Sequence, residues 1–149
     1  MSTFQQRRAQ RARRAGLIGS AGFVALWAFA GAIGLVGGGA DLGPEISARL
    51  PLDSQVLAGL LLASIVGVPM TCTAILALRV RPSAAVAGMG SGLLLLGWVA
   101  IQPLVIGQFH WLQPVFGVLG GLVCLLGSSL YRSSDEFRLP RLPFRPSPA

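Results

Sequence analysis

The stretch from Gln55 to Leu78, QVLAGLLLASIVGVPMTCTAILAL, contains no charged side chain. At about 1.5 Å of rise per residue, a helix over this stretch is about 36 Å long, enough to cross a hydrocarbon core of about 30 Å. Three further uncharged apolar blocks flank it, at about residues 16–38, 84–107 and 114–131. Because lipid leaves backbone polar groups no partner outside the segment, each block is predicted to be a membrane-spanning helix within a transmembrane domain of residues 16–131.

The composition of the whole chain agrees with this prediction. Hydrophobic residues make up 53% of the 149 residues, charged residues only 11%, and the mean hydropathy is +0.69. Soluble domains carry about 25% charged residues, and disordered chains are polar, so both classes are excluded. Two cysteines are too few for a disulfide scaffold. We therefore predict an all-α membrane protein, a four-transmembrane-helix bundle.

The positive charges predict the orientation. The chain has twelve arginines, no lysine and five acids, for a net charge of +7. Eleven arginines lie in the two tails, residues 1–15 and 132–149, or between the second and third spans, whereas Arg49 lies between the first and second. Cytoplasmic segments collect positive charge, so both termini are predicted to be cytoplasmic (N-in, C-in), with the chain in a bacterial plasma membrane.

The arginines of the N-terminal tail also suggest a partner. They lie at a helix end and not along one face, which disfavours nucleic acid. We interpret them first as orientation signals and second as contacts for anionic lipid headgroups. The residues concerned are Arg7, Arg8, Arg11, Arg13 and Arg14.

Local signals mark the helix boundaries. Asp53 or Ser54 suits the N-cap of the second helix, Pro82 follows its end, and Pro114 suits the first turn of the fourth. The first block, at residues 16–38, exceeds the 7–15 apolar residues of a typical signal peptide. A retained first span is therefore favoured over a cleaved leader.

Glycines predict how the helices pack. Lipid is as apolar as leucine, so helices in a bilayer associate where small residues let their backbones approach. Among the 20 glycines, pairs four residues apart are Gly34 and Gly38, Gly88 and Gly92, and Gly117 and Gly121. We expect these stripes to pack within the bundle. The alternative is that one stripe faces a second copy or a larger membrane complex.

The spans lack the groups that carry most membrane chemistry. None contains Asp, Glu, Lys, Arg or His, which argues against a proton channel or a proton-coupled multidrug transporter. His110 is the only histidine, so no metal site, no haem and no other cofactor is predicted. Cys72 and Cys124 differ in predicted depth by about 10 Å, so we expect both to be unpaired core residues. No catalytic residue is identified.

Two prolines lie inside predicted spans. Pro69 and Pro103 each remove a backbone hydrogen bond and favour a bend, and Thr71 and Thr73 are placed to bond freed carbonyls. Fixed bends are favoured over a transporter hinge.

One polar cluster lies at the predicted outer face. It comprises Gln102, His110, Trp111 and Gln113, and Gln102 lies about two turns inside the third span. A buried glutamine needs a partner, which His110 or Gln113 would supply. The cluster is interpreted as an aromatic belt closing a tight hairpin, or as a small binding site for a quinone, a lipid headgroup or a peptide.

Two stretches carry a resemblance. LPLDSQVLAG at 50–59, continuing to VPMT at 68–71, is one, and GWVAIQ at 97–102, continuing to WLQP at 111–114, is the other. They resemble small uncharacterised four-span integral membrane proteins of high-G+C bacteria. The resemblance covers about residues 50–127 and implies the four-span topology and a bacterial plasma membrane, with no activity, cofactor or catalytic residue.

These observations favour a function that is not enzymatic. We expect an accessory or structural subunit that packs against a larger membrane complex or against itself. The alternative is a small transporter or a lipid- or quinone-binding protein that uses the bent second and third helices and the cluster around Gln102.

Overall fold

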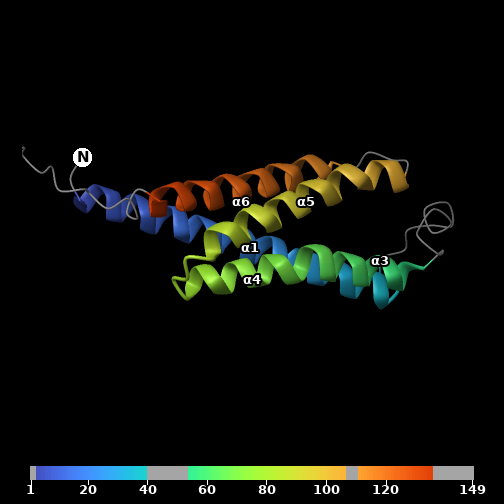
Figure 1. Ribbon diagram of the computed structural model, residues 1–149. Helices are drawn as coiled ribbons and strands as arrows, with labels where there is room; N and C mark the ends of the chain where they lie inside the picture. Colours follow the sequence, from blue (N-terminus) through green and yellow to red (C-terminus); the bar gives the residue numbers. More distant parts are fainter. Residues whose placement is uncertain (1–2, 40–53, 107–110, 136–149) are drawn as a thin grey trace, which may run out of the picture.

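The computed structural model describes residues 3–39, 54–106 and 111–135. All regular structure in these ranges is helical, and four helices are long and apolar enough to cross a membrane, as predicted (Figure 1). The second of the four spans is continuous but changes its winding, and is therefore given as three elements. The elements are α1 (Thr3–Val36), α3 (Gln55–Leu62), the π-helix η2 (Ala63–Gly67), α4 (Val68–Leu78), α5 (Ala84–Ile106) and α6 (Leu112–Asp135).

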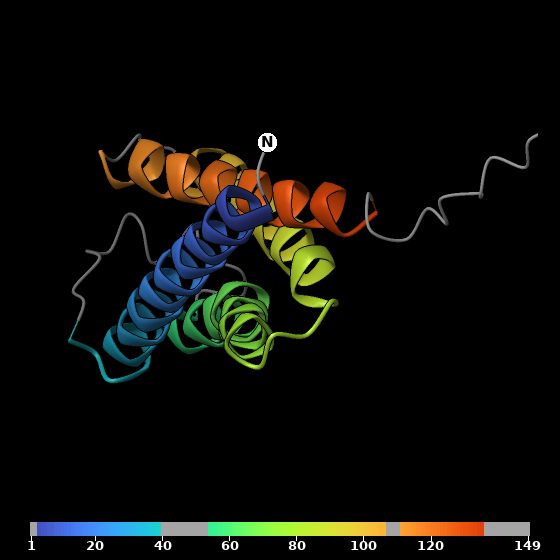
Figure 2. The same cartoon turned by 90° about the vertical axis from the view of Figure 1, so that its left-hand side faces the viewer.

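The helices form a bundle in which each span packs on its neighbours in the chain. α1 contacts α3 and α4, α4 contacts α5, α5 contacts α6, and α6 returns to α1. Figure 1 shows α5 and α6 together on one side and α1 with α4 on the other, and Figure 2 shows α1 crossing the bundle obliquely. The contact between α5 and α6 is the most extensive.

The first helix is longer than the apolar block that predicted it. It begins at Thr3 and not near Gly16, so all five N-terminal arginines lie on helix. At its other end Gly38 adopts φ +70°, and the Gly39 N–H donates to the Gly34 carbonyl at 2.9 Å. This bond across a left-handed residue closes the helix, and glycine adopts that conformation without a Cβ clash.

The second span begins at a predicted cap and changes its winding just before Pro69. The Ser54 hydroxyl caps it by accepting from the Leu57 N–H at 3.2 Å. Just before Pro69 the helix widens, and the Val68 N–H donates to the Ala63 carbonyl five residues back. Thr71 Oγ1 donates to the Gly67 carbonyl at 2.8 Å, which satisfies one carbonyl beside the proline.

The turn between α4 and α5 is strained at one residue. Val80 has φ +56°, although it is β-branched, and the Arg81 N–H donates to the Leu76 carbonyl at 3.0 Å. This is the same closing bond that Gly38 makes possible in α1. With a side chain in this conformation, the turn costs about 1–2 kcal/mol more than with glycine.

Glycines bring the backbones of α5 and α6 into contact. A Cβ on Gly92 would lie 2.7 Å from the Gly120 carbonyl oxygen and from the Cys124 nitrogen, and one on Gly127 would lie 2.8 Å from the Ala85 carbonyl oxygen. Any side chain there would force the helices apart. The predicted Gly88 and Gly92 stripe therefore packs inside the bundle, as expected.

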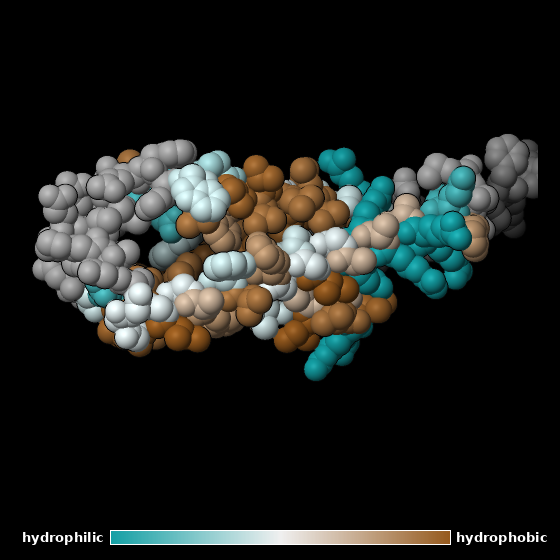
Figure 3. Space-filling view, turned by 180° about the vertical axis from the view of Figure 1, so that it is seen from behind, coloured by the Kyte–Doolittle hydropathy of each residue, from teal (hydrophilic) through white to brown (hydrophobic). Residues whose placement is uncertain are grey.

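The predicted stripe on the fourth span lies elsewhere. A Cβ added to Gly117 or Gly121 would meet no atom within 4 Å, so these two glycines face away from the bundle. Large apolar side chains such as Leu104 and Val118 are exposed on the same two helices, α5 and α6. Seen from behind, the body of the molecule is mainly hydrophobic and gives way to a hydrophilic end (Figure 3). Such a surface suits contact with lipid or with another membrane helix.

The glycine contacts predict a difference between two neighbouring positions on α5. Gly92→Ala should lower the free energy of unfolding by about 2 kcal/mol or more, because its Cβ meets backbone atoms that cannot move alone. Gly90→Ala, whose Cβ would meet nothing within 4 Å, should leave it unchanged or raise it by up to about 1 kcal/mol. Unfolding in detergent measures both, and equal destabilisation would contradict the packing.

Candidate functional site

The predicted outer-face cluster is only partly within the described residues. Gln102 is half-buried near the end of α5, Gln113 is buried in the first turn of α6, and Trp111 is 69% exposed. His110 lies outside the described residues. Gln113 is engaged in an interaction of its own. The cluster therefore stays a prediction. Among its described members, Gln102 and Gln113 are the ones that are at least partly buried.

One buried donor lies next to this cluster. Trp98 precedes Gln102 by four residues, so the two share a face of α5. Its indole Nε1 is buried and has no hydrogen-bond partner among the described residues. Sequence periodicity did not single out Trp98, because it carries no information about whether an N–H is paired.

A second polar feature joins two helices in the interior. The hydroxyls of Thr73 on α4 and Ser91 on α5 are hydrogen-bonded at 3.0 Å, and both residues are buried. The Thr73 hydroxyl was predicted to bond a carbonyl freed by Pro69. It bonds Ser91 on the neighbouring helix instead. The pair is satisfied within the bundle and offers no charged or strongly nucleophilic group.

The cysteines differ in position from the prediction. Both are free, as expected. Cys72 is exposed on the outside of α4 and Cys124 is half-buried against α5, so the expectation of a core position is wrong for Cys72. Among the described residues no three His, Cys, Asp or Glu side chains gather to hold a metal ion.

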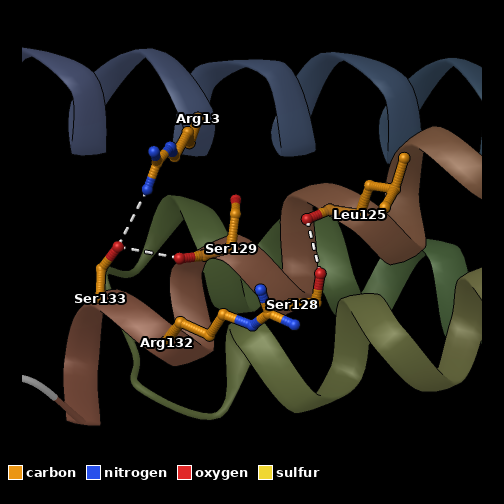
Figure 4. Close-up of a pocket in the computed structure, with 6 residues that line it drawn as sticks. All are labelled: Arg13, Leu125, Ser128, Ser129, Arg132 and Ser133. Carbon is orange, nitrogen blue, oxygen red and sulfur yellow. Dashed lines mark hydrogen bonds between the residues drawn. The ribbon is translucent and has the colours of Figure 1, made fainter.

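A recess between α1 and α6 brings together residues that the sequence separates by more than a hundred positions. It encloses about 540 Å³ at the arginine-bearing end of the bundle (Figure 4). Arg13 Nη1 donates to Ser133 Oγ at 3.0 Å across the two helices. The lining residues are Arg13, Leu125, Ser128, Ser129, Arg132 and Ser133.

The hydrogen bonds of the recess determine which groups remain to bind a ligand. Ser128, Ser129 and Ser133 each donate to a carbonyl of α6 itself, at 2.8–2.9 Å. Their oxygens are therefore left as acceptors, and one holds Arg13. The donors that remain in the recess are guanidinium N–H groups of Arg13 and Arg132, which favour an anion.

Sequence analysis identified only one of these two arginines as a lipid contact. Arg13 was predicted with its four N-terminal neighbours, whereas Arg132 was assigned only to the C-terminal tail. The even number of spans does place both at the same membrane face. The packing of α1 on α6, which the sequence does not determine, makes them neighbours.

The fold defines the class of protein: a four-helix bundle with the helices of a membrane protein. Comparison with protein-family models, curated proteins and solved structures finds no match to this chain. The resemblance to four-span proteins of high-G+C bacteria remains a prediction. The function is therefore argued from the site and surfaces alone.

The Trp98 indole, which has no hydrogen-bond partner among the described residues, provides a test of whether a ligand binds beside it. A buried N–H without a hydrogen-bond partner lowers the free energy of unfolding by about 1–3 kcal/mol. Trp98→Phe removes this N–H, and the gain should offset the loss of ring volume. The free energy of unfolding should therefore stay within about 1 kcal/mol of the parent. Trp27→Phe, at an exposed position on α1, is the control. A loss well above 2 kcal/mol, measured by unfolding in detergent, would show that an acceptor fills the site.

Proposed function

We propose that this chain is a non-enzymatic accessory or structural subunit of a membrane complex. The observation that carries the proposal is the outward stripe of Gly117 and Gly121 on α6. Gly120 and Gly127, about a quarter turn around the same helix, pack against α5. A second small-residue face that the bundle leaves open suits close approach by a transmembrane helix of a partner.

The interior supports the same proposal. Its buried side chains are mainly Ala, Val and Leu, and the polar ones among the described residues are Thr73, Ser91 and Gln113. Thr73 and Ser91 bond one another, and Gln113 has an interaction of its own. The described interior thus provides helix-to-helix contacts and no row of polar groups along which a substrate would move.

The alternative is a small transporter or a lipid- or quinone-binding protein with a site near the outer face. Its support is the buried Trp98 Nε1 without a described partner, one turn from the half-buried Gln102. Such a donor suits a carbonyl oxygen of a ligand. We favour the packing function because the glycine stripe offers two open positions one turn apart and the alternative depends on one N–H.

The orientation belongs to the proposal: a bacterial plasma membrane with both termini in the cytoplasm. Its support is the asymmetry of the arginines. Alkaline phosphatase, which is active only after export, should be inactive when fused after Ala149 and active when inserted after Gly43. Activity of the fusion at Ala149 would contradict the orientation.

The glycine stripe itself is tested by two matched substitutions. Gly121→Leu should abolish association with the partner subunit or second copy, because the leucine fills the space that the partner's backbone needs. Gly97→Leu is the control, since its Cβ also meets nothing within 4 Å but lies on α5. The measurement is purification of the tagged full chain in mild detergent, with identification and quantification of the proteins that accompany it.

Both variants should unfold at the temperature of the parent or slightly above it, since no atom lies within 4 Å of either added Cβ and leucine favours a helix more than glycine. Retention of the same accompanying proteins by Gly121→Leu would overturn the assignment of the stripe. If the parent chain purifies alone and as a monomer, the packing function is wrong and the alternative is favoured.

A further inference from the structure

We infer that the recess between α1 and α6 is a binding site for one anionic phospholipid, whose phosphate is held by Arg13 and Arg132 and whose acyl chain lies along α6. The inference does not depend on the proposed packing function, since it concerns a different face of α6. It goes beyond a general attraction of arginines to anionic membranes because it specifies two residues, from opposite ends of the chain, and one lipid.

The two guanidinium groups supply the phosphate contacts. One N–H of the Arg13 guanidinium donates to Ser133, and four N–H groups remain. Arg132 has no hydrogen-bond partner among the side chains that the structure describes, which end at Ser133, and its side chain runs along α6 toward Ser128 (Figure 4). Both arginines line the recess, and guanidinium N–H groups pair with phosphate oxygens in a fixed fork. The pair, called the clamp below, therefore suits the oxygens of one phosphate headgroup.

An apolar strip continues from this clamp along the same helix face. Val118, Leu122 and Leu125 are followed at helical spacing by Ser129 and Arg132, so all five lie on one side of α6. The three apolar side chains are 72%, 42% and 68% exposed, and Leu125 also lines the recess. A polar end joined to an exposed apolar strip fits an amphiphile better than a soluble phosphate.

The dimensions agree with a lipid in one leaflet. Val118 lies fourteen residues before Arg132, which is about 21 Å along the helix, and half a hydrocarbon core is about 15 Å thick. The strip therefore runs from the headgroup level to near the bilayer midplane. The centre of the Gly117 and Gly121 stripe lies roughly a quarter turn around the helix from the centre of the strip, and the two surfaces adjoin at Gly121 and Leu125. A partner helix and the lipid would therefore be neighbours on α6.

Two sources of negative charge near Arg132 would oppose the binding of a phosphate. The C-terminal end of α6 carries about half a negative charge, which two full guanidinium charges exceed. The acids nearest in sequence are Asp135 and Glu136, three and four residues after Arg132. Removal of these two carboxyl groups should therefore strengthen lipid binding or leave it unchanged.

The experiment titrates phosphatidylglycerol, with phosphatidylcholine as the uncharged reference, into the full chain in detergent and counts retained lipids by native mass spectrometry. The parent should retain one phosphatidylglycerol in preference to phosphatidylcholine. Arg13→Gln with Arg132→Gln should weaken this binding about tenfold or more. Arg7→Gln with Arg8→Gln removes the same charge outside the recess and should weaken it less than about twofold.

Further variants distinguish the contribution of the two arginines from that of the apolar strip and from an effect on folding. Leu122→Ser with Leu125→Ser should weaken lipid binding several-fold with both arginines intact. Arg132→Gln alone keeps the bond from Arg13 to Ser133, so it tests the clamp if the double variant does not fold. Asp135→Asn with Glu136→Gln should not weaken binding.

Three outcomes would overturn the inference. Equal weakening by the two arginine pairs would show a diffuse charge effect. Displacement of the lipid by millimolar inorganic phosphate would show a soluble-anion site. Unchanged binding in the double variant would place the lipid elsewhere. Gly121→Leu should still bind the lipid, which keeps failure of the packing function distinguishable from failure of this site.

Discussion

The backbones of α5 and α6 touch at four glycines, Gly88, Gly92, Gly120 and Gly127, in the most extensive contact between helices of the described bundle. In lipid, apolar side chains gain little by leaving one apolar neighbour for another, so association depends on close van der Waals contact and a few hydrogen bonds. Glycine makes the closest approach available. Leu17 of α1 then packs against Gly88, and the Thr73 and Ser91 hydroxyls join α4 to the pair.

This mode of packing leaves the chain with two distinct outer surfaces on α6. The glycine stripe is smooth and lies nearer the α5 side by helical geometry, whereas the apolar strip that ends at Arg132 lies nearer α1, whose Arg13 reaches Ser133. A partner's helix needs close approach to the backbone. A lipid needs a positively charged site for its headgroup and an apolar surface for its acyl chains. The two proposals assign one surface to each.

Much of the fold follows from the sequence because its signals are local. The spans at 55–78 and 84–107 agree with α3 to α4 and with α5, and Ser54 caps the helix that it was predicted to cap. Charge-free length and capping chemistry are properties of neighbouring residues. The inward direction of Gly88 and Gly92 was also expected, although spacing alone did not identify Gly120 and Gly127 as their partners.

The rest of the site is not predictable from the sequence for a physical reason. In a bilayer both the buried and the outer face of a helix are apolar, so hydrophobic periodicity does not reveal which side faces the bundle. The outward direction of Gly117 and Gly121, the exposure of Cys72 and the unpaired Trp98 N–H all depend on that rotation. The recess depends in addition on α1 lying beside α6, a tertiary contact between distant parts of the chain.

The unbroken length of α1 has a mechanical consequence. Its 34 residues span about 51 Å, so about 20 Å of rigid rod extends past a hydrocarbon core of about 30 Å. A change of about 20° in its inclination would swing the tip of that rod sideways by about 7 Å. Because the rod carries Arg7, Arg8 and Arg11 near its free end, a small rocking of the embedded part becomes a displacement of positive charge beside the membrane.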